Sequence, residues 1–166
     1  MPPILRSAQF NDLEEIKNLY LAVTARPHGL ARTPEEINDF YIKDFLTNSL
    51  EQGLIWVLEQ EKELWGEIHG YTLSPAIFRH TLTNVTFVIH PDQQKKGLGK
   101  MLFGKFMEKV KIEMPHIMRI ELITQENNLG AIHLYESFGF KREGVMKRRI
   151  WKDGAFANDT LYAWLR

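Results

Sequence analysis

The chain passes from a strand through a turn into a helix at Val88-Ile89-His90-Pro91-Asp92-Gln93-Gln94-Lys95-Lys96-Gly97-Leu98-Gly99-Lys100. Apolar and β-branched residues from Leu82 to His90 predict the strand, and apolar residues spaced by three or four predict a helix from about Gly97 to Glu113. Gly97 and Gly99 carry no Cβ, so an anion can approach the backbone N–H groups of the turn closely. Because three lysines also lie there, the stretch predicts a phosphate or pyrophosphate site.

Three motifs compete for these glycines. The dinucleotide fingerprint G-x-G-x-x-G fails, because Leu102 stands where the third glycine belongs. A Walker A reading from Gly99 fails, because Phe106 replaces the Ser or Thr that binds magnesium. The pattern Q-x-x-G-x-G fits from Gln94 to Gly99. An ordinary glycine turn before a helix is the structural alternative.

A second pattern follows a predicted strand and occupies Asn128-Leu129-Gly130-Ala131-Ile132-His133-Leu134-Tyr135-Glu136-Ser137-Phe138-Gly139-Phe140. Together the two segments resemble the GNAT superfamily of acyl-CoA-dependent N-acetyltransferases, which carry [R/Q]-x-x-G-x-[G/A] and then N-x-x-A-x-x-L-Y-x-x-x-G-F. The resemblance is specific from about Leu82 to Phe140 and follows the element order of the whole chain. Gln94 departs from the commoner arginine. The resemblance implies a GNAT-like fold and acetyl transfer from acetyl-CoA to a primary amine.

The remaining patterns predict one α/β domain over residues 1–166, with a mixed, mostly antiparallel central sheet flanked by about four helices. Asn11 with Glu14, and Thr33 with Glu36, are predicted to cap the first two helices. The second helix is expected to bury Ile37, Phe40, Tyr41 and Phe45. Strands are expected at residues 4–10, 54–60, 64–73, 82–90 and 117–124, a helix at 128–138, and a terminal hairpin around Asp153-Gly154.

The resemblance also implies a cofactor site and a mechanism. Backbone N–H groups of residues 95–100 would bind the CoA pyrophosphate, and the pantetheine arm would pair with residues 88–90 in a splay between two central strands. Asn128 would hold that arm, and Tyr135 would place its hydroxyl near the thioester sulfur. The implied cofactor-binding residues are Val88, Ile89, His90, Gln94, Lys95, Lys96, Gly97, Leu98, Gly99, Lys100, Asn128 and Tyr135.

Acetyl transfer from a thioester to an amine requires two proton transfers. The departing thiolate needs a proton, which the phenol of Tyr135 can give. An alkyl amine is mostly protonated at pH 7, so a base must first remove its proton. Glu121, His90 and Glu67 are the candidates, and Glu121 is favoured because it lies on the strand beside the expected splay. A strand N–H near Ile89 is the implied donor to the oxyanion. Direct transfer in a ternary complex is the expected route.

Composition narrows the function classes. Lysine plus arginine equals aspartate plus glutamate at 21 each, which gives no reason to expect a nucleic-acid or membrane-surface partner. The chain contains no cysteine, and no two of its six histidines lie three or four residues apart, so no metal is expected. We expect a cytoplasmic protein. Two rival functions remain: a non-catalytic acyl-CoA-binding module of the same fold, and a nucleotide-binding protein.

The sequence says least about the identity of the amine acceptor. A small-molecule amine or a peptide amine fits the chemistry, and the family places acceptors against the loops near residues 28–32 and 74–80 and the tail hairpin. Arg26, Arg32 and Arg79 are candidates to bind a carboxylate, as in an amino acid. The basic residues 141–149 are either a solvated hairpin or a contact for a phosphate, an acidic partner or RNA. Exposed edge strands make a homodimer possible.

Overall fold

A computed structural model describes the chain apart from Met1, Pro27 and His28. Of the loop expected near residues 28–32, His28 therefore lies outside the described residues. The elements are β1 (Ile4–Ser7), α1 (Leu13–Thr24), α2 (Asp39–Gln52), β2 (Gly53–Gln60), β3 (Glu63–Thr72), β4 (Thr81–Ile89), α3 (Leu98–Glu113), β5 (Arg119–Gln125), α4 (Leu129–Ser137), β6 (Lys141–Lys152) and β7 (Ala155–Leu165). This order confirms the predicted mixed α/β succession of strands and helices.

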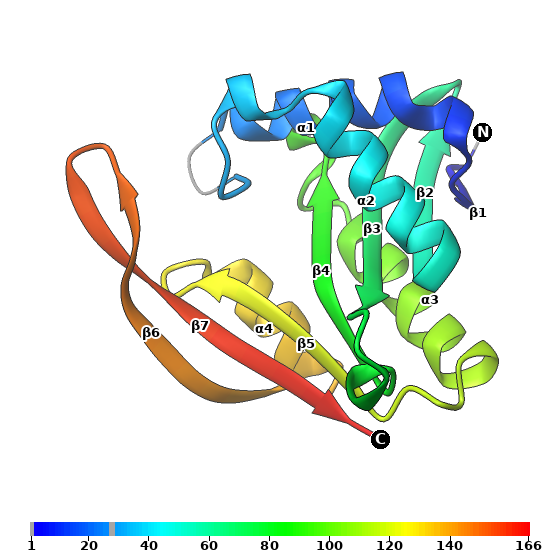
Figure 1. Cartoon of the computed structure of the whole chain (residues 1–166). Helices are drawn as coiled ribbons and strands as arrows, with labels where there is room; N and C mark the ends of the chain where they lie inside the picture. Colours follow the sequence, from blue (N-terminus) through cyan, green and yellow to red (C-terminus); the bar gives the residue numbers. More distant parts are fainter. Residues whose placement is uncertain (1, 27–28) are drawn as a thin grey trace.

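The strands form one seven-stranded sheet in the order β1-β2-β3-β4-β5-β7-β6. Every neighbouring pair is antiparallel except β4 and β5, whose parallel pairing is confined to Thr81 with Arg119 and Leu82 with Ile120. Beyond these residues the two strands diverge, as Figure 1 shows. Asn84, at φ +52°, lies two residues after the last pair and beside a register shift against β3. Such a bulge bends a strand, which accounts for the divergence.

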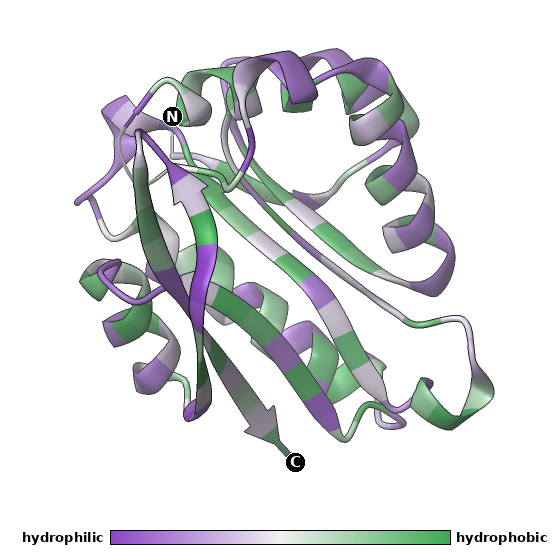
Figure 2. Cartoon of the chain, turned by 60° about the vertical axis from the view of Figure 1, so that its left-hand side comes forward, coloured by the Kyte–Doolittle hydropathy of each residue, from purple (hydrophilic) through white to green (hydrophobic). Residues whose placement is uncertain are grey.

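Helices cover both faces of the sheet. One buried cluster joins α1 and α2 to residues of β2, β3 and β4, and a second joins α3 and α4 to β3, β4, β5 and β7. Hydrophobic and hydrophilic residues alternate along the strands in Figure 2. Since both faces are covered, the central strands bury side chains on both sides, polar ones included. None of the helices in the described residues is long and apolar enough to cross a membrane.

Two tight turns close the hairpins where the sequence predicted them. Glu61 and Lys62 join β2 to β3, and Asp153 and Gly154 join β6 to β7, all with φ between +53° and +75°. Positive φ at both central residues is the geometry of two-residue hairpin turns that match the twist of the strands.

The starts of the first two helices differ from the prediction. Asp12, not Glu14, closes the first cap: its Oδ2 accepts from the Gln9 N–H at 2.7 Å, and Arg6 binds the same carboxylate at 2.8 Å. A 3₁₀ turn, η1 (Phe10–Asp12), therefore precedes α1. Asn11 and Glu14 do not form the predicted box, because Asp12 is fixed by these two donors.

The predicted box at Thr33 and Glu36 forms, with the Thr33 N–H donating to Glu36 at 2.7 Å, but it closes only the 3₁₀ turn η2 (Pro34–Glu36). The helix α2 begins later, with Asn38 as its cap. The expected burial of Phe40 is therefore wrong: its side chain is 83% exposed. The buried stripe of α2 consists of Ile42, Phe45, Leu46 and Ser49.

Phe103 gives a direct test of the packing between α3 and α4. It is fully buried, and its ring lies within 5.1–6.1 Å of five other aromatic rings. We expect Phe103→Ala to lower the free energy of unfolding by about 3–5 kcal/mol, because a large cavity replaces these contacts. Phe40→Ala is the matched control, and chemical denaturation should show a change below about 0.5 kcal/mol for it. Equal losses from both variants would contradict this packing.

Candidate active site

The N-terminus of α3 forms a cradle of free backbone donors. Gly97 is the helix cap at φ +78°, and no side chain caps the helix. The first intrahelical bond runs from the Met101 N–H to the Gly97 oxygen, so the N–H groups of residues 98–100 have no partner within the helix. The first turn contains no acidic residue, and Lys100 lies within it. The cradle is therefore electropositive and suited to an anion.

The loop that forms the cradle is held against the end of β4. Gln94 donates from Nε2 to the Ile89 oxygen at 3.2 Å and so ties the loop to the last residue of the strand. A Cβ added at Gly99 would meet Cζ of Phe87 at 3.2 Å, closer than side chains normally pack. Glycine therefore lets the first turn of α3 lie against β4 and keeps the cradle beside the strand.

The free edge of β4 points into the gap left by β5. The His90 N–H donates to the Trp65 oxygen on β3 at 2.8 Å. Because successive residues of a strand direct their polar groups to opposite edges, the N–H groups of Ile89 and Phe87 point toward β5. The two strands pair only at residues 81–82 and 119–120, so these groups have no strand partner there. The gap can thus accept an extended polar chain.

A pocket of about 470 Å³ opens on this gap and joins seven of the predicted site residues. Asn128 lies on its wall and caps α4, with Oδ1 accepting from the Ala131 N–H at 3.3 Å. The side-chain NH₂ of Asn128 remains available to a ligand. The predicted residues that line the pocket are Val88, Ile89, Gln94, Lys95, Gly99, Asn128 and Tyr135.

Tyr135 of α4 is 93% buried in the same pocket wall. Its ring packs against Phe103 and Phe140, with centroids 5.4 and 6.2 Å away. Burial raises the pKa of its phenol far above the ordinary value, because the charged phenolate would be desolvated. Tyr135 therefore holds its proton at neutral pH and can act as a donor.

The family model described as "Acetyltransferase (GNAT) family" matches residues 13–140, most of the chain. The chain belongs to the GNAT acetyltransferase family. This confirms the family resemblance that the two motifs indicated.

Individual relatives agree with the family. A segment of 63 residues is 36% identical to the L-amino acid N-acyltransferase MnaT of Escherichia coli and covers 38% of this chain and 35% of MnaT. The chain thus aligns with about a third of that relative's length. A longer segment is 28% identical over 110 residues to the ribosomal protein bS18-alanine N-acetyltransferase of Escherichia coli, and covers 66% of this chain and 68% of the relative.

Solved structures confirm the GNAT fold. The acetyltransferase yncA of Salmonella typhimurium, determined with its cofactor acetyl-CoA, superimposes with a TM-score of 0.87. The alignment covers 99% of this chain and 94% of that one at 18% identity. At this identity the comparison supports the fold alone.

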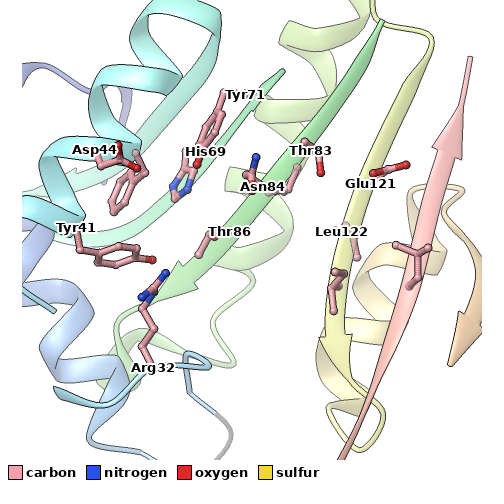
Figure 3. A pocket seen from close by; sticks show the side chains of 14 residues that line it. Arg32, Tyr41, Asp44, His69, Tyr71, Thr83, Asn84, Thr86, Glu121 and Leu122 are labelled. Atoms are coloured by element: carbon pink, nitrogen blue, oxygen red, sulfur yellow. The ribbon is translucent and has the colours of Figure 1, made fainter. Parts of the chain in front are cut away.

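A second pocket of this GNAT domain, about 270 Å³, lies between α2, β3, β4 and β5. Figure 3 shows Arg32 and Tyr41 on one side and Glu121 on β5 at the other. The Arg32 guanidinium lies 3.9 Å from the centre of the Tyr41 ring, a cation–π contact at the pocket wall. Residues 83–86 of β4 line this pocket and residues 87–89 line the first one. The two pockets therefore follow one another along β4 at the gap.

The structure separates the three base candidates. Glu121 borders the second pocket, but Arg119 donates to its Oε1 at 2.7 Å. His90 borders a different hollow beside α1 and the β2–β3 turn, and its Nδ1 accepts from the Asp92 N–H at 3.3 Å. Glu67 is fully buried on β3. Only Glu121 of the three lines either of the two pockets at the gap.

Other sequence expectations are placed as follows. Lys96, Gly97, Leu98 and Lys100 lie at the cradle but outside the pocket lining. Arg26 borders the first pocket, whereas residues 74–80, with Arg79, line neither pocket at the gap. The basic strand β6 is partly neutralised, since Arg142 pairs with Glu126 and Arg149 with Asp159. No metal-binding group of three or more ligand side chains occurs among residues 2–26 and 29–166.

A buried polar cluster beside the second pocket was not found by sequence reasoning. Tyr20 of α1 donates to Oε2 of Glu67 at 2.5 Å, and Nδ1 of His69 lies 2.9 Å from Oε1 of the same carboxylate. His69 lines the pocket, whereas Glu67 and Tyr20 lie behind it. Glu67 and His69 are two residues apart on a strand and so share a face, which is the signal that was available in the sequence.

Gly99 tests the cradle. We expect Gly99→Glu to abolish acetyl-CoA binding, because it adds bulk and negative charge where a pyrophosphate must reach the N–H groups. The new Cβ displaces the Phe87 ring, so thermal unfolding is measured alongside to show that the variant is folded, although an acidic residue is itself favourable in the first turn of a helix. Gly144→Glu is the control, because a Cβ there meets nothing within 4 Å. Calorimetry with CoA should show binding to the control and none to Gly99→Glu; equal affinities would refute the cradle.

Proposed function

We propose that the protein transfers the acetyl group of acetyl-CoA to a primary amine, directly and in a ternary complex. The observation that carries this proposal is the pair of pockets that meet at the β4–β5 gap. One pocket is lined by Gly99 of the anion cradle and by Tyr135, and the other faces α2. Two substrates bound from opposite sides would meet without a covalent enzyme intermediate. The chain also offers no cysteine nucleophile.

The residues of the first pocket suit CoA chemistry. The N–H groups of residues 98–100 and the lysines beside them would hold the pyrophosphate. The free edge of β4 at Phe87 and Ile89, together with Asn128, would hydrogen-bond the amide groups of the pantetheine arm. Acetyl-CoA supplies an acyl group activated as a thioester. The Ile89 N–H would stabilise negative charge on the carbonyl oxygen, and Tyr135 would protonate the departing sulfur.

The second pocket favours a small amine that also bears a carboxylate. Arg32 is the arginine that lines it, and its guanidinium can bind a carboxylate with two parallel hydrogen bonds. The relative MnaT, named for acylation of L-amino acids, agrees with this class. The second candidate is the terminal amine of a peptide, which the longer alignment with the ribosomal protein alanine N-acetyltransferase favours.

A panel of acceptors would separate these two classes. We expect free thiol release with at least one of the twenty L-amino acids, and much weaker release with the corresponding amides, which lack the carboxylate. Arg32→Gln should lower kcat/KM for the acids by about 10- to 100-fold, the scale of a lost hydrogen bond to a charged group, and leave the amides unchanged. Arg79→Gln is the control. Preference for an alanine-initiated peptide, unaffected by Arg32→Gln, would favour the peptide class instead.

Tyr135→Phe tests the proton donor. The ring and its packing remain, so the affinity for acetyl-CoA should hold while the chemical step slows by about 10²- to 10⁴-fold. Tyr162→Phe is the matched control, because that buried ring packs 6.4 Å from Tyr135 and lines neither pocket. Single-turnover rates would decide the matter. A Tyr135→Phe enzyme within about threefold of the parent would show that another group protonates the sulfur.

A further inference from the structure

The second pocket, in which we propose that the acceptor binds, is called the acceptor pocket below. It contains one imidazole, that of His69, which is held in a fixed orientation. The His69 ring stacks on Phe45 of α2, with centroids 4.2 Å apart and planes 7° from parallel. On its other side Tyr71 lies 6.3 Å away at 11°. The side chain is 3% exposed, yet it lines the pocket, and Figure 3 shows the ring directed into it. Packing on both faces leaves the ring little freedom to turn.

The partners of His69 select its tautomer. Oε1 of Glu67 lies 2.9 Å from Nδ1, and a carboxylate can only accept, so Nδ1 carries the hydrogen. Nε2 then has the lone pair. Tyr20 donates to the second oxygen of Glu67, and burial beside Glu67 raises the pKa of this phenol, so Tyr20 remains a donor. Glu67 thus has one partner at each carboxylate oxygen, and Nε2 is the ring nitrogen that is left to face a ligand.

The position of His69 along the sheet matches the site of transfer. It pairs with Thr86 of β4, and Glu67 pairs with Val88. Thr86 is the last residue of β4 that lines the acceptor pocket. Phe87 is the first that lines the other pocket, in which we propose that acetyl-CoA binds. His69 therefore lies level with the junction of the two pockets, on the face of the sheet that the acceptor would approach.

We propose that His69 is the general base that takes the proton from the acceptor amine, and that Glu67 and Tyr20 are its positioning residues. This assignment rests on the proposed amine acetylation. It replaces Glu121 in that role, because the Glu121 carboxylate is already bound by Arg119, whereas Nε2 of His69 has no hydrogen-bond partner among the described residues.

The protons balance in this scheme. Nε2 of His69 removes one proton from the ammonium form of the acceptor, and Glu67 stabilises the resulting imidazolium. The amine lone pair then forms the C–N bond to the acetyl carbon. As the C–S bond breaks, Tyr135 gives its phenol proton to the sulfur, and it regains one from the nitrogen that becomes the amide. His69 afterwards loses its proton to water, so one proton is released for each acetyl group transferred.

Ionisable groups from several elements surround His69. Glu67 and Tyr20 contact the ring nitrogen Nδ1 directly. The other titratable or charged groups that line the pocket are Arg32, Tyr41, Asp44, Tyr71 and Glu121.

The decisive variant is His69→Asn, whose side-chain amide can still donate to Glu67 but cannot act as a base. We expect kcat/KM for the L-amino acids, or for an alanine-initiated peptide, to fall by about 10²- to 10⁴-fold. The affinity for acetyl-CoA should remain within about twofold, and the acidic limb of the kcat/KM–pH profile should disappear. His116→Asn, in the exposed turn between α3 and β5, is the matched control and should behave as the parent.

Two further variants distinguish catalysis from packing. Glu67→Gln removes the carboxylate that stabilises the imidazolium, so the acidic limb should move to lower pH. His69→Ala leaves a cavity, and added imidazole should restore part of the turnover there but not in His69→Asn.

The assignment is overturned if His69→Asn keeps kcat/KM within about threefold of the parent, a small effect on the barrier. If His69→Asn does not fold, failure of imidazole to restore His69→Ala overturns it. A parent that binds CoA but acetylates none of these probes would instead contradict the proposed function itself, and with it the role of His69.

Discussion

The divergence of β4 and β5 is the constraint on which the other features of the site depend. The two strands are parallel, so their carboxyl ends lie at the same end of the gap, and each continues into a loop and a helix. The cradle at α3 and the Asn128 cap at α4 therefore meet at one place. In open sheets, ligands bind at such carboxyl ends where neighbouring connections separate. Full pairing of β4 with β5 would occupy the same backbone groups and close the site.

Local sequence patterns predicted the succession of elements well. The hairpin at Asp153-Gly154 follows from residues that tolerate positive φ, and the strand-to-helix turn at Gly97 follows from two glycines. The hairpin at Glu61-Lys62 follows instead from the two strand patterns that flank it. A splay between two central strands was expected from the family resemblance alone, and the structure shows it as a parallel pairing limited to two residues of each strand. The bulge at Asn84 has no clear sequence signature, because it depends on the register against β3.

The errors lie where tertiary contacts override local preference. Asn11 and Glu14 have the residue types and the spacing of a helix cap. However, Arg6 and the Gln9 N–H both donate to Asp12, and these two hydrogen bonds set the start of α1. Phe40 fits a helical stripe counted from Thr33. The chain leaves the helix path after Glu36 and restarts at Asn38, so the buried face rotates.

The buried pair on β3 shows a different limit. In a strand with alternating polar and apolar residues, the polar side chains usually face water. The pattern Glu67-Ile68-His69 therefore predicts that Glu67 and His69 are exposed. Here α1 and α2 cover that face as well, so the polar residues are enclosed and must satisfy one another. The sequence shows that Glu67 and His69 are two residues apart, but it does not show that helices cover this face of the sheet. The sequence therefore indicated Glu121, His90 and Glu67 as candidate bases but not the imidazole of His69, which lies beside Glu67.

The free edge of β4 also bears on aggregation through strand pairing. Unpaired N–H and C=O groups along a strand usually invite pairing with another chain and lead to aggregation. In this sheet the borders are β1 and β6, and the unpaired segment of β4 lies inside, between β3 and β5, with helices over both faces. A second sheet cannot dock there edge to edge. The molecule can thus keep a strand open to a narrow, extended ligand without offering a template for fibril growth.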